Sequence, residues 1–207
     1  MSGSGAIDPA AYRRALGLFA TGVTVITVQR EDIMHGMTAN AFSALSLDPP
    51  LVLFCVGKGA RMAKYLDGAE GFAVNILSAD QERISAQFAG YDKDSDRLVE
   101  ALTRGPIAPL IPGTLVSLSC TLEARHEGGD HWIIVGRVIE IHEPEGGNPR
   151  PPLLFFRSRY GTLIERGEPL PDQVVWSNDA IRIYHDEWSV DADEVPEEDH
   201  VRAHIWN

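Results

Sequence analysis

The feature that most constrains the fold is a pair of long, β-rich segments separated by a short turn. Residues 113–127 (GTLVSLSCTLEARHE) and 131–143 (HWIIVGRVIEIHE) are rich in β-branched and apolar residues, and the tripeptide Gly128-Gly129-Asp130 joins them. Glycine and aspartate adopt the backbone conformations that a tight hairpin turn needs. The sequence therefore predicts two long antiparallel strands, whose outer edges require further strands or other cover.

Shorter β-rich segments supply these partners. We expect strands at 23–29 (VTVITVQ), 33–42 (IMHGMTANAF), 51–56 (LVLFCV), 71–77 (GFAVNIL) and 152–158 (PLLFFRS). A turn at 30–32 joins the first two of them. Because 51–56 is continuously apolar, it predicts a strand that is buried on both faces.

Three segments have helical signals. Asp8 and Pro9 can begin a helix whose apolar residues recur three or four positions apart, and Gly22 is expected to end it. A short helix is predicted at 60–66, and a third begins near 79–82, where acidic residues occupy the first turn. Residues 91–110 are polar and irregular, which predicts a long loop containing a short helix.

The order of these elements decides the fold class. Strands follow one another through hairpins, helices interrupt them at two points, and no GxGxxG motif follows a strand. A doubly wound dinucleotide-binding fold is therefore disfavoured. We expect a mainly β fold with flanking helices, in which an antiparallel sheet closes or partly closes into a barrel.

Composition argues against several classes of partner. The formal net charge is −12, whereas binding to nucleic acid phosphates needs clustered Lys and Arg. No stretch approaches the roughly 20 apolar residues of a membrane span, and the first residues lack the apolar core of a signal peptide. We expect a cytoplasmic protein that binds neither nucleic acid nor membrane.

The C-terminal part differs in character from the rest. Eight acidic residues and no Lys or Arg lie between His185 and Asp199. We divide the chain into a main domain at 1–165 and an acidic extension at 166–207. The aromatic residues Trp176, Tyr184 and Trp188 are expected to pack the extension on the main domain or on a second subunit.

Metal and nucleophile chemistry have little support. Cys55 and Cys120 each lie in an apolar run and have no second cysteine two to four positions away, so we expect free, buried thiols and no zinc site. The seven histidines are scattered, and we predict no metal site. Ser119 has no general base near it in the sequence.

The segment 35–56 has the most informative polar pattern. A strand leads into Thr-Ala-Asn-Ala-Phe-Ser, which combines hydroxyl, amide and backbone groups with small side chains. Such an edge can approach a flat heterocycle and form hydrogen bonds with it. An ordinary strand end with a Ser/Thr turn is the alternative, and the residues alone leave both open.

Residues 36–56 (GMTANAFSALSLDPPLVLFCV) resemble the signature of the flavin reductase family, the split-barrel reductase components of two-component flavin-dependent monooxygenases. Segments 15–28, 71–90 and 131–143, the last followed by 152–163, resemble the family's other elements in the same order. The resemblance covers residues 9–163. It implies a split β-barrel homodimer with one non-covalent FMN or FAD per subunit, which NADH or NADPH reduces and which serves a separate monooxygenase.

The resemblance also implies positions for the cofactor. The isoalloxazine ring, the ribityl-phosphate chain and the borders of the site are expected to contact Thr38, Ala39, Asn40, Ser43, Cys55, Val56, Lys58, Ala60, Arg61, Phe88, Ala89, Arg159 and Tyr160. His131 matches a histidine near the nicotinamide and is the expected catalytic residue. Hydride passes directly from nicotinamide C4 to flavin N5, so the protein mainly positions the two rings.

The sequence departs from the family in the phosphate-binding stretch. Where the family commonly has Ser and Thr hydroxyls, this chain has Gly59, Ala60, Arg61 and Met62, so the choice between FMN and FAD stays open. Two other functions stay open as well. One is a split-barrel flavoprotein that acts on its own organic substrate, and the other is a non-enzymatic flavin- or haem-binding carrier.

Overall fold

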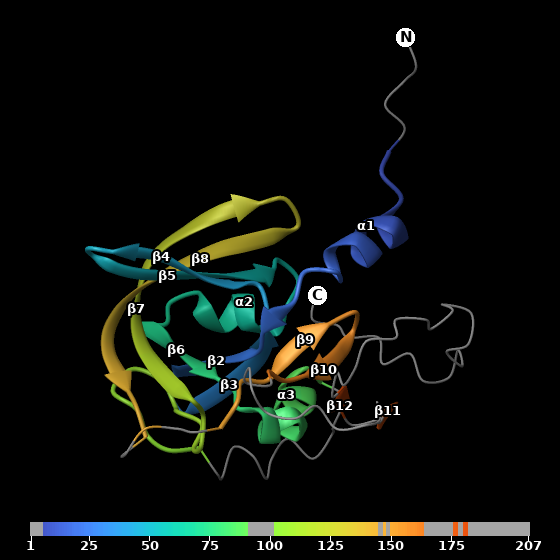
Figure 1. The fold of residues 1–207 in the computed structure, drawn as a ribbon. Helices are drawn as coiled ribbons and strands as arrows, with labels where there is room; N and C mark the ends of the chain where they lie inside the picture. The colour runs from blue at the N-terminus through green and yellow to red at the C-terminus, as the bar shows by residue number, and fades with distance from the viewer. Residues whose placement is uncertain are drawn as a thin grey trace.

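The computed structural model describes residues 6–90, 102–144, 147 and 150–163, with the backbone alone of 176–177 and 180–181. A seven-stranded sheet curls around the short helix α2 (Arg61–Leu66) (Figure 1). Its strands lie in the order β3 (Ile33–Ala39), β2 (Thr24–Arg30), β6 (Gly71–Ile76), β7 (Val116–Gly128), β8 (His131–His142), β5 (Pro50–Gly57) and β4 (Phe42–Leu47). Every neighbouring pair is antiparallel, which confirms a mainly β fold, while closure of the barrel stays a prediction.

The long hairpin predicted from the sequence is the pair β7 and β8. Its register shifts twice, between Ser119 and Cys120 and again between Leu122 and Ala124. Such irregularities bend a strand and increase its twist. The curl of the whole sheet follows from these bends, because β6 pairs with one edge of the hairpin and β5 with the other.

A second sheet pairs a segment near the start of the main domain with segments near its end. It contains β1 (Thr21–Gly22), β9 (Leu154–Phe156), β10 (Arg159–Gly161), β12 (Ala180–Ile181) and β11 (Trp176–Ser177). The backbone of β12 pairs in parallel with β10. The remainder of the acidic extension, including Tyr184 and Trp188, lies outside the described residues, so the proposed extension stays a prediction.

The first helix is shorter than its sequence pattern suggests. Asp8 caps α1 (Pro9–Leu16) as expected, because its carboxylate accepts hydrogen bonds from the amides of Ala10 and Ala11. The expectation that Gly22 ends this helix is wrong, since α1 ends at Leu16. Residues 21–22 instead pair with β9, a contact between distant segments that local spacing does not reveal.

The polar segment after His35 forms two strands rather than the single one expected. Strand β3 ends at Ala39, which pairs with Thr24, whereas Phe42 begins β4 and pairs with Phe54. The chain therefore passes from one edge strand of the sheet to the other across a turn at Asn40 and Ala41. This turn places polar groups at the opening between the two edges.

Strand β5 is buried on one face only, which corrects the expectation from its apolar sequence. Val52, Phe54 and Val56 are buried, and the residues between them are half-buried. This alternation is the ordinary period of a strand whose second face has less cover. The apolar side chains on that second face, Leu53 and Cys55, are thus available to line a pocket.

The core fills the inside of the curled sheet. Phe54 and Phe72 pack edge to face with ring centroids 5.0 Å apart. A Cβ atom at Gly136 would overlap the Phe72 ring, so a glycine is required there. Cys55 and Cys120 are free thiols, as expected, and burial raises the pKa of Cys120 to about 12.

A buried amide joins the strands to the loop that precedes β7. The Nδ2 group of Asn75 donates to the Val25 carbonyl at 3.0 Å, and its Oδ1 accepts from the Ile111 amide at 3.0 Å and from the Ser117 hydroxyl at 2.8 Å. Because the side chain is fully buried and fully bonded, it adds order to the core without the cost of an unpaired polar group.

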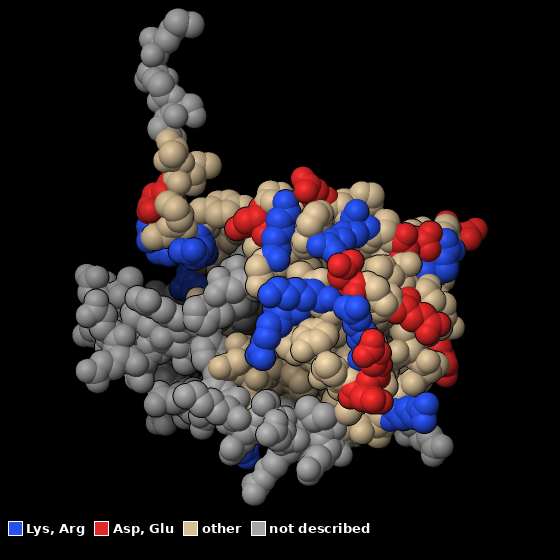
Figure 2. All heavy atoms as spheres, turned by 180° about the vertical axis from the view of Figure 1, so that it is seen from behind, with Lys and Arg blue, Asp and Glu red and all other residues tan. Residues whose placement is uncertain are grey.

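Charged side chains cover the outside. Acidic and basic residues are interspersed on the face shown in Figure 2. In the part of the chain that the structure describes, no helix is both long enough and apolar enough to cross a membrane.

The contact between α2 and β3 contains a half-buried histidine. The ring of His35 lies 4.8 Å from the ring of Tyr65, centroid to centroid. Burial, with a smaller contribution from the charge of Arg61, lowers the pKa of His35 from 6.5 to about 4. The unfolded chain therefore binds a proton at this position between pH 6.5 and 4, and the folded protein does not.

The stability that His35 contributes is complete above pH 6.5 and is lost as the pH falls towards 4. We expect the free energy of unfolding of the wild type to fall by on the order of 1–2 kcal/mol more than that of His35→Gln over this range, after allowance for screening by solvent. Urea unfolding at several pH values measures the difference. Parallel curves for the two proteins would contradict the assignment.

Candidate functional site

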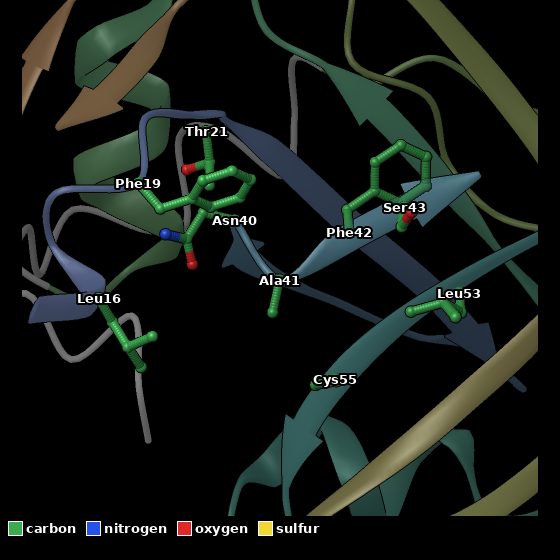
Figure 3. Close-up of a pocket in the computed structure, with 9 residues that line it drawn as sticks. All are labelled: Leu16, Phe19, Thr21, Asn40, Ala41, Phe42, Ser43, Leu53 and Cys55. Carbon is green, nitrogen blue, oxygen red and sulfur yellow. The ribbon is translucent and has the colours of Figure 1, made fainter. Parts of the chain in front are cut away.

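A pocket of about 350 Å³ opens where the segment after α1 meets the start of β4 and the neighbouring part of β5 (Figure 3). It is mainly apolar and combines the end of α1, strand β1, the turn after β3, and strands β4 and β5. The lining residues are Leu16, Phe19, Thr21, Asn40, Ala41, Phe42, Ser43, Leu53 and Cys55. Pockets with apolar walls and a few polar groups are typical sites for small molecules and cofactors.

Two polar atoms of this pocket have no hydrogen-bond partner. The Oδ1 atom of Asn40 and the Oγ1 atom of Thr21 are both buried and unbonded. An unpaired buried polar atom costs roughly 1–3 kcal/mol, so native proteins rarely leave one without reason. The residues thus fit the flavin that the sequence resemblance implies, since the pyrimidine edge of that ring carries donors and acceptors.

Three of the sequence-predicted residues line this pocket, namely Asn40, Ser43 and Cys55. The hydroxyl of Ser43 donates to the Ala44 carbonyl at 2.9 Å. Burial raises the pKa of the Cys55 thiol, so this group is a neutral, weakly polar part of the wall. Among the predicted residues, Asn40 is therefore the one with an unsatisfied polar atom here.

Thr38, Ala39 and Val56 belong to the same strands but do not line the pocket. The Thr38 hydroxyl donates to the Ser85 carbonyl at 2.6 Å, and the side chains of Ala39 and Val56 lie in the core. Successive side chains of a strand point to opposite faces. The motif therefore identifies the correct strands, while the pocket is lined by residues of the turn after β3, by the start of β4 and by Leu53 and Cys55, which alternate with Val56 on β5.

A second group of predicted residues surrounds helix α3 (Glu82–Phe88), which the 3₁₀ turn η1 (Ala79–Gln81) precedes. The Tyr160 hydroxyl lies 2.8 Å from the Ser85 hydroxyl, and the Phe88 ring packs directly against Gly36. Ala89 caps α3, and Arg159 begins β10. Ser85 also accepts from Thr38, so this group adjoins β3 rather than the pocket lining.

The third group lies where β5 meets β8. Gly57 pairs with His131, and the Lys58 amide donates to the Asp130 carbonyl at 2.9 Å. The Lys58 Nζ atom lies 4.7 Å from the centre of the Trp132 ring and 3.5 Å from a Glu127 carboxylate oxygen. These contacts hold the lysine near the end of the hairpin.

His131 has a defined orientation in this group. Its Nδ1 atom lies 2.8 Å from the Asp130 carboxylate, and its side chain is 22% exposed. The hydrogen bond from His131 lowers the pKa of Asp130. A charged acceptor at Nδ1 fixes the ring, which is what a residue that positions a ligand requires.

Ala60 and Arg61 lie at the start of α2. Ala60 is the N-cap residue and makes no side-chain cap bond, and Arg61 is exposed. Residues 59–62 therefore provide no Ser or Thr hydroxyl for a phosphate, which is the departure from the family noted in the sequence. The backbone amides and the arginine are the groups available there for an anion.

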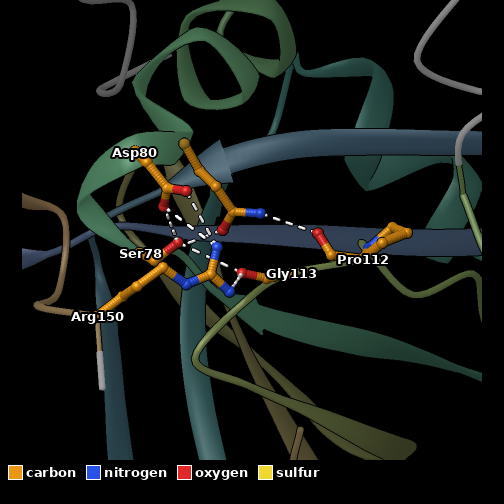
Figure 4. A network of polar contacts seen from close by, with 6 residues as sticks. Ser78, Asp80, Pro112, Gly113 and Arg150 are labelled. Atoms are coloured by element: carbon orange, nitrogen blue, oxygen red, sulfur yellow. Dashed lines mark hydrogen bonds and ion pairs between the residues drawn. The ribbon is translucent and has the colours of Figure 1, made fainter. Parts of the chain in front are cut away.

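Two other polar clusters have structural roles. The Ser119 hydroxyl lies 2.8 Å from the Nε2 atom of His142, a possible base that is distant from it in the sequence. Because Ser119 is completely buried, no substrate can reach it. Arg150 bonds to Asp80 at 3.0 Å and to the Gly113 carbonyl, and Ser78 bonds to Asp80, which connects three loops (Figure 4). In the described part of the chain, no cluster of His, Cys, Asp or Glu could hold a metal ion.

Sequence reasoning missed several lining residues, namely Leu16, Phe19, Thr21, Ala41, Phe42 and Leu53. Most of them are apolar and give no local signal. Thr21 lies in the segment 15–28 that resembles the family, but its distance along the chain from Asn40 hides their shared pocket. Pairing of β1 with β9 brings it there.

Comparisons with known proteins identify the family of the chain. An NADH-dependent flavin reductase of Rhodococcus sp is 41% identical over 168 residues, which cover 79% of this chain and 92% of that protein. The reductase component of 4-hydroxyphenylacetate 3-monooxygenase from Thermus thermophilus is 40% identical over 154 residues, 74% of this chain and 96% of that protein.

Solved structures show the same fold. The NADH:FAD oxidoreductase SgcE6 of Streptomyces globisporus, in complex with NAD and FAD fragments, superposes with a TM-score of 0.70 at 38% identity, covering 80% of this chain and 100% of that one. The Flavin reductase like domain family matches residues 16–163, which include the pocket, the α3 group and the β5–β8 group. The chain therefore belongs to the flavin reductase family.

Proposed function

We propose that this protein is an NADH-dependent flavin reductase that reduces FMN or FAD and supplies the reduced flavin to a separate monooxygenase. The observation that carries the proposal is the apolar pocket beside Asn40. Residues of the segment 36–56 form much of its lining, and the buried Oδ1 atom of Asn40 has no hydrogen-bond partner. The names of relatives support the hydride donor and the type of partner. The two free cysteines suit a reducing compartment, and we place the protein in the cytoplasm.

The chain's own residues bind and orient rather than react. A bound flavin supplies a ring that accepts hydride at N5, and NADH supplies the hydride from C4. Phe42, Leu53 and Cys55 form apolar walls that exclude water from one side of the site. Exclusion of water strengthens the hydrogen bonds made there and fixes the geometry on which hydride transfer depends.

Residues near the junction of β5 and β8 and at the start of α2 bind the other parts of the ligands. Lys58, Ala60 and Arg61 provide charge and backbone amides for the phosphate of the flavin. His131, held by Asp130, orients the nicotinamide. Relatives include both an NADH-dependent FMN reductase and an NADH-dependent FAD reductase, so both flavins remain candidates.

We also propose a homodimer. Helix α1 has no buried residue; its Tyr12 is 54% exposed, and Leu18 and Phe19, which follow the helix, are 57% and 74% exposed. Leu47, at the end of β4, is 95% exposed. Exposed apolar groups of this size are typical of interaction surfaces, and a second copy of the chain would cover them.

Oxidation of NADH under air, followed at 340 nm, tests the proposed activity. We expect steady turnover with FMN or FAD and little without added flavin, and the better flavin is identified in the same assay. Flavin binding without turnover would favour a flavoprotein that acts on its own organic substrate. Binding with no turnover in the presence of any candidate substrate would favour a carrier.

His131→Ala should slow hydride transfer by about 10- to 100-fold, because misplacement of one reacting ring has costs of this size. Flavin affinity should change by less than about threefold, since this residue is expected to contact the nicotinamide. Stopped-flow reduction and flavin fluorescence titration separate the two effects. His126→Ala, at an exposed position of the same hairpin, is the matched control. A collapse of flavin affinity in His131→Ala would refute this role.

Sedimentation velocity tests the dimer. The wild type should sediment at about twice the mass of one chain at micromolar concentration. Leu47→Asp should shift the equilibrium towards monomer, because it places a charge in the covered surface. Asp32→Ala, in the turn between β2 and β3, should not. A wild type that sediments as a monomer at all concentrations would exclude this assembly.

A further inference from the structure

Two cationic side chains lie against one aromatic ring near the turn of the β7–β8 hairpin. The Arg125 guanidinium carbon is 3.8 Å from the centre of the Trp132 ring, and the Lys58 Nζ atom is 4.7 Å from it. A guanidinium packed on an indole keeps a defined orientation, because the ring attracts the charge and matches its flat shape. None of the three residues lines the apolar pocket.

Strand pairing brings these side chains to one face of the sheet. Trp132 pairs with Val56 and Arg125 pairs with Ile134, and both partners belong to the core. Residues paired across antiparallel strands share a face, so Trp132 and Arg125 lie on the inner face of the curled sheet. Lys58 follows Val56 by two positions. The backbone therefore fixes the cluster without help from a ligand.

Arg125 differs from neighbouring basic residues in its lack of an acidic partner. Arg137 on the same hairpin makes two hydrogen bonds to Glu123, and Lys58 lies 3.5 Å from Glu127. Among the described residues, the ion pairs of the structure do not include Arg125, which is exposed. Its donors are therefore oriented and available to a ligand.

Phosphate is the ligand chemistry that fits these donors. A guanidinium binds two phosphate oxygens side by side, and an ammonium adds a second positive charge. The Glu127 side chain is 75% exposed, and ion pairs of exposed carboxylates are weak, so an anionic ligand can take its place beside Lys58. Two positive charges around one ring suit a ligand with two linked phosphates.

The cluster adjoins residues proposed for both substrates. Lys58 belongs to the group proposed for the flavin phosphate, and His131, proposed for the nicotinamide, directly precedes Trp132. Ala60 packs against the same core cluster as Trp132. FAD and NADH each continue from these parts through a pyrophosphate to adenosine, whereas FMN ends at a single phosphate.

We propose that Arg125 and Lys58 form a binding site for the pyrophosphate of an adenine dinucleotide, which FAD or NADH supplies. The inference rests on the proposed function, and it assigns to Arg125 a binding role that neither the sequence resemblance nor the pocket gives it. Trp132 is a positioning residue that holds the guanidinium. The arginine supplies phosphate donors in a chain whose residues 59–62 offer no hydroxyl.

Calorimetric titration with ADP tests the site directly. The wild type should bind ADP, and Arg125→Ala should bind it at least about tenfold more weakly, because charge-assisted hydrogen bonds are lost. Arg125→Lys keeps the charge without the paired donors and should recover only part of the affinity. Arg104→Ala removes an exposed arginine outside the cluster and should bind ADP like the wild type.

Two further comparisons identify the dinucleotide. If FAD supplies the pyrophosphate, Arg125→Ala should weaken FAD binding about tenfold and FMN binding by less than about threefold. If NADH supplies it, the variant should raise the KM for NADH about tenfold with kcat near the wild-type value. The KM for reduced nicotinamide mononucleotide, which lacks the pyrophosphate, should not change.

Failure of the site and failure of the proposed function give different results. A wild type that reduces flavin but does not bind ADP, or whose ADP affinity Arg125→Ala leaves unchanged, would overturn the site alone. Equal loss of FMN and FAD affinity in that variant would also contradict a pyrophosphate contact. A wild type that binds ADP through Arg125 yet reduces neither flavin would refute the proposed function, while the ADP site would remain.

Discussion

The curl of the main sheet positions both the core and the pocket. Two irregularities in the register of β7 and β8 bend the longest hairpin, and the shorter strands follow it on both sides. The bend brings the edge strands β3 and β4 near each other, so that a short turn at Asn40 and Ala41 can connect them. It also encloses α2, whose Met62 and Leu66 complete the core.

This arrangement explains why the pocket combines apolar walls with unsatisfied polar atoms. The inner face of β5 belongs to the core, and its second face contributes Leu53 and Cys55 to the pocket. Backbone groups of a connecting turn are not all used by sheet pairing, and polar side chains gather there. A site of this kind binds a flat, amphipathic ring through stacking area and a few directed hydrogen bonds. The chemistry then belongs to the bound ligands, while the protein supplies their geometry.

The residues that the sequence predicts for one site lie in three separate places in the structure, namely the pocket, the α3 group and the β5–β8 group. The motif at 36–56 predicts the correct strands, yet Thr38 bonds to Ser85 and faces α3, while Asn40 lies in the pocket. The difference arises because β3 ends at Ala39, so Thr38 lies within the strand whereas Asn40 lies in the turn that follows it. Lys58 and His131 lie close together for another reason: antiparallel pairing of β5 and β8 places Gly57 opposite His131.

Residue patterns predicted the mainly β class, the long hairpin, the cap at Asp8 and the family, because these depend on local propensity, turn chemistry and ordered motifs. They did not predict where α1 ends, that β3 and β4 are separate strands, or which face of β5 is buried. These features depend on pairing between segments far apart in the chain, such as β1 with β9 and β5 with β8. Thr21 shows the difference most clearly. It lines the same pocket as Asn40 because the folded chain pairs β1 with β9, whose residues are more than a hundred positions away in the sequence.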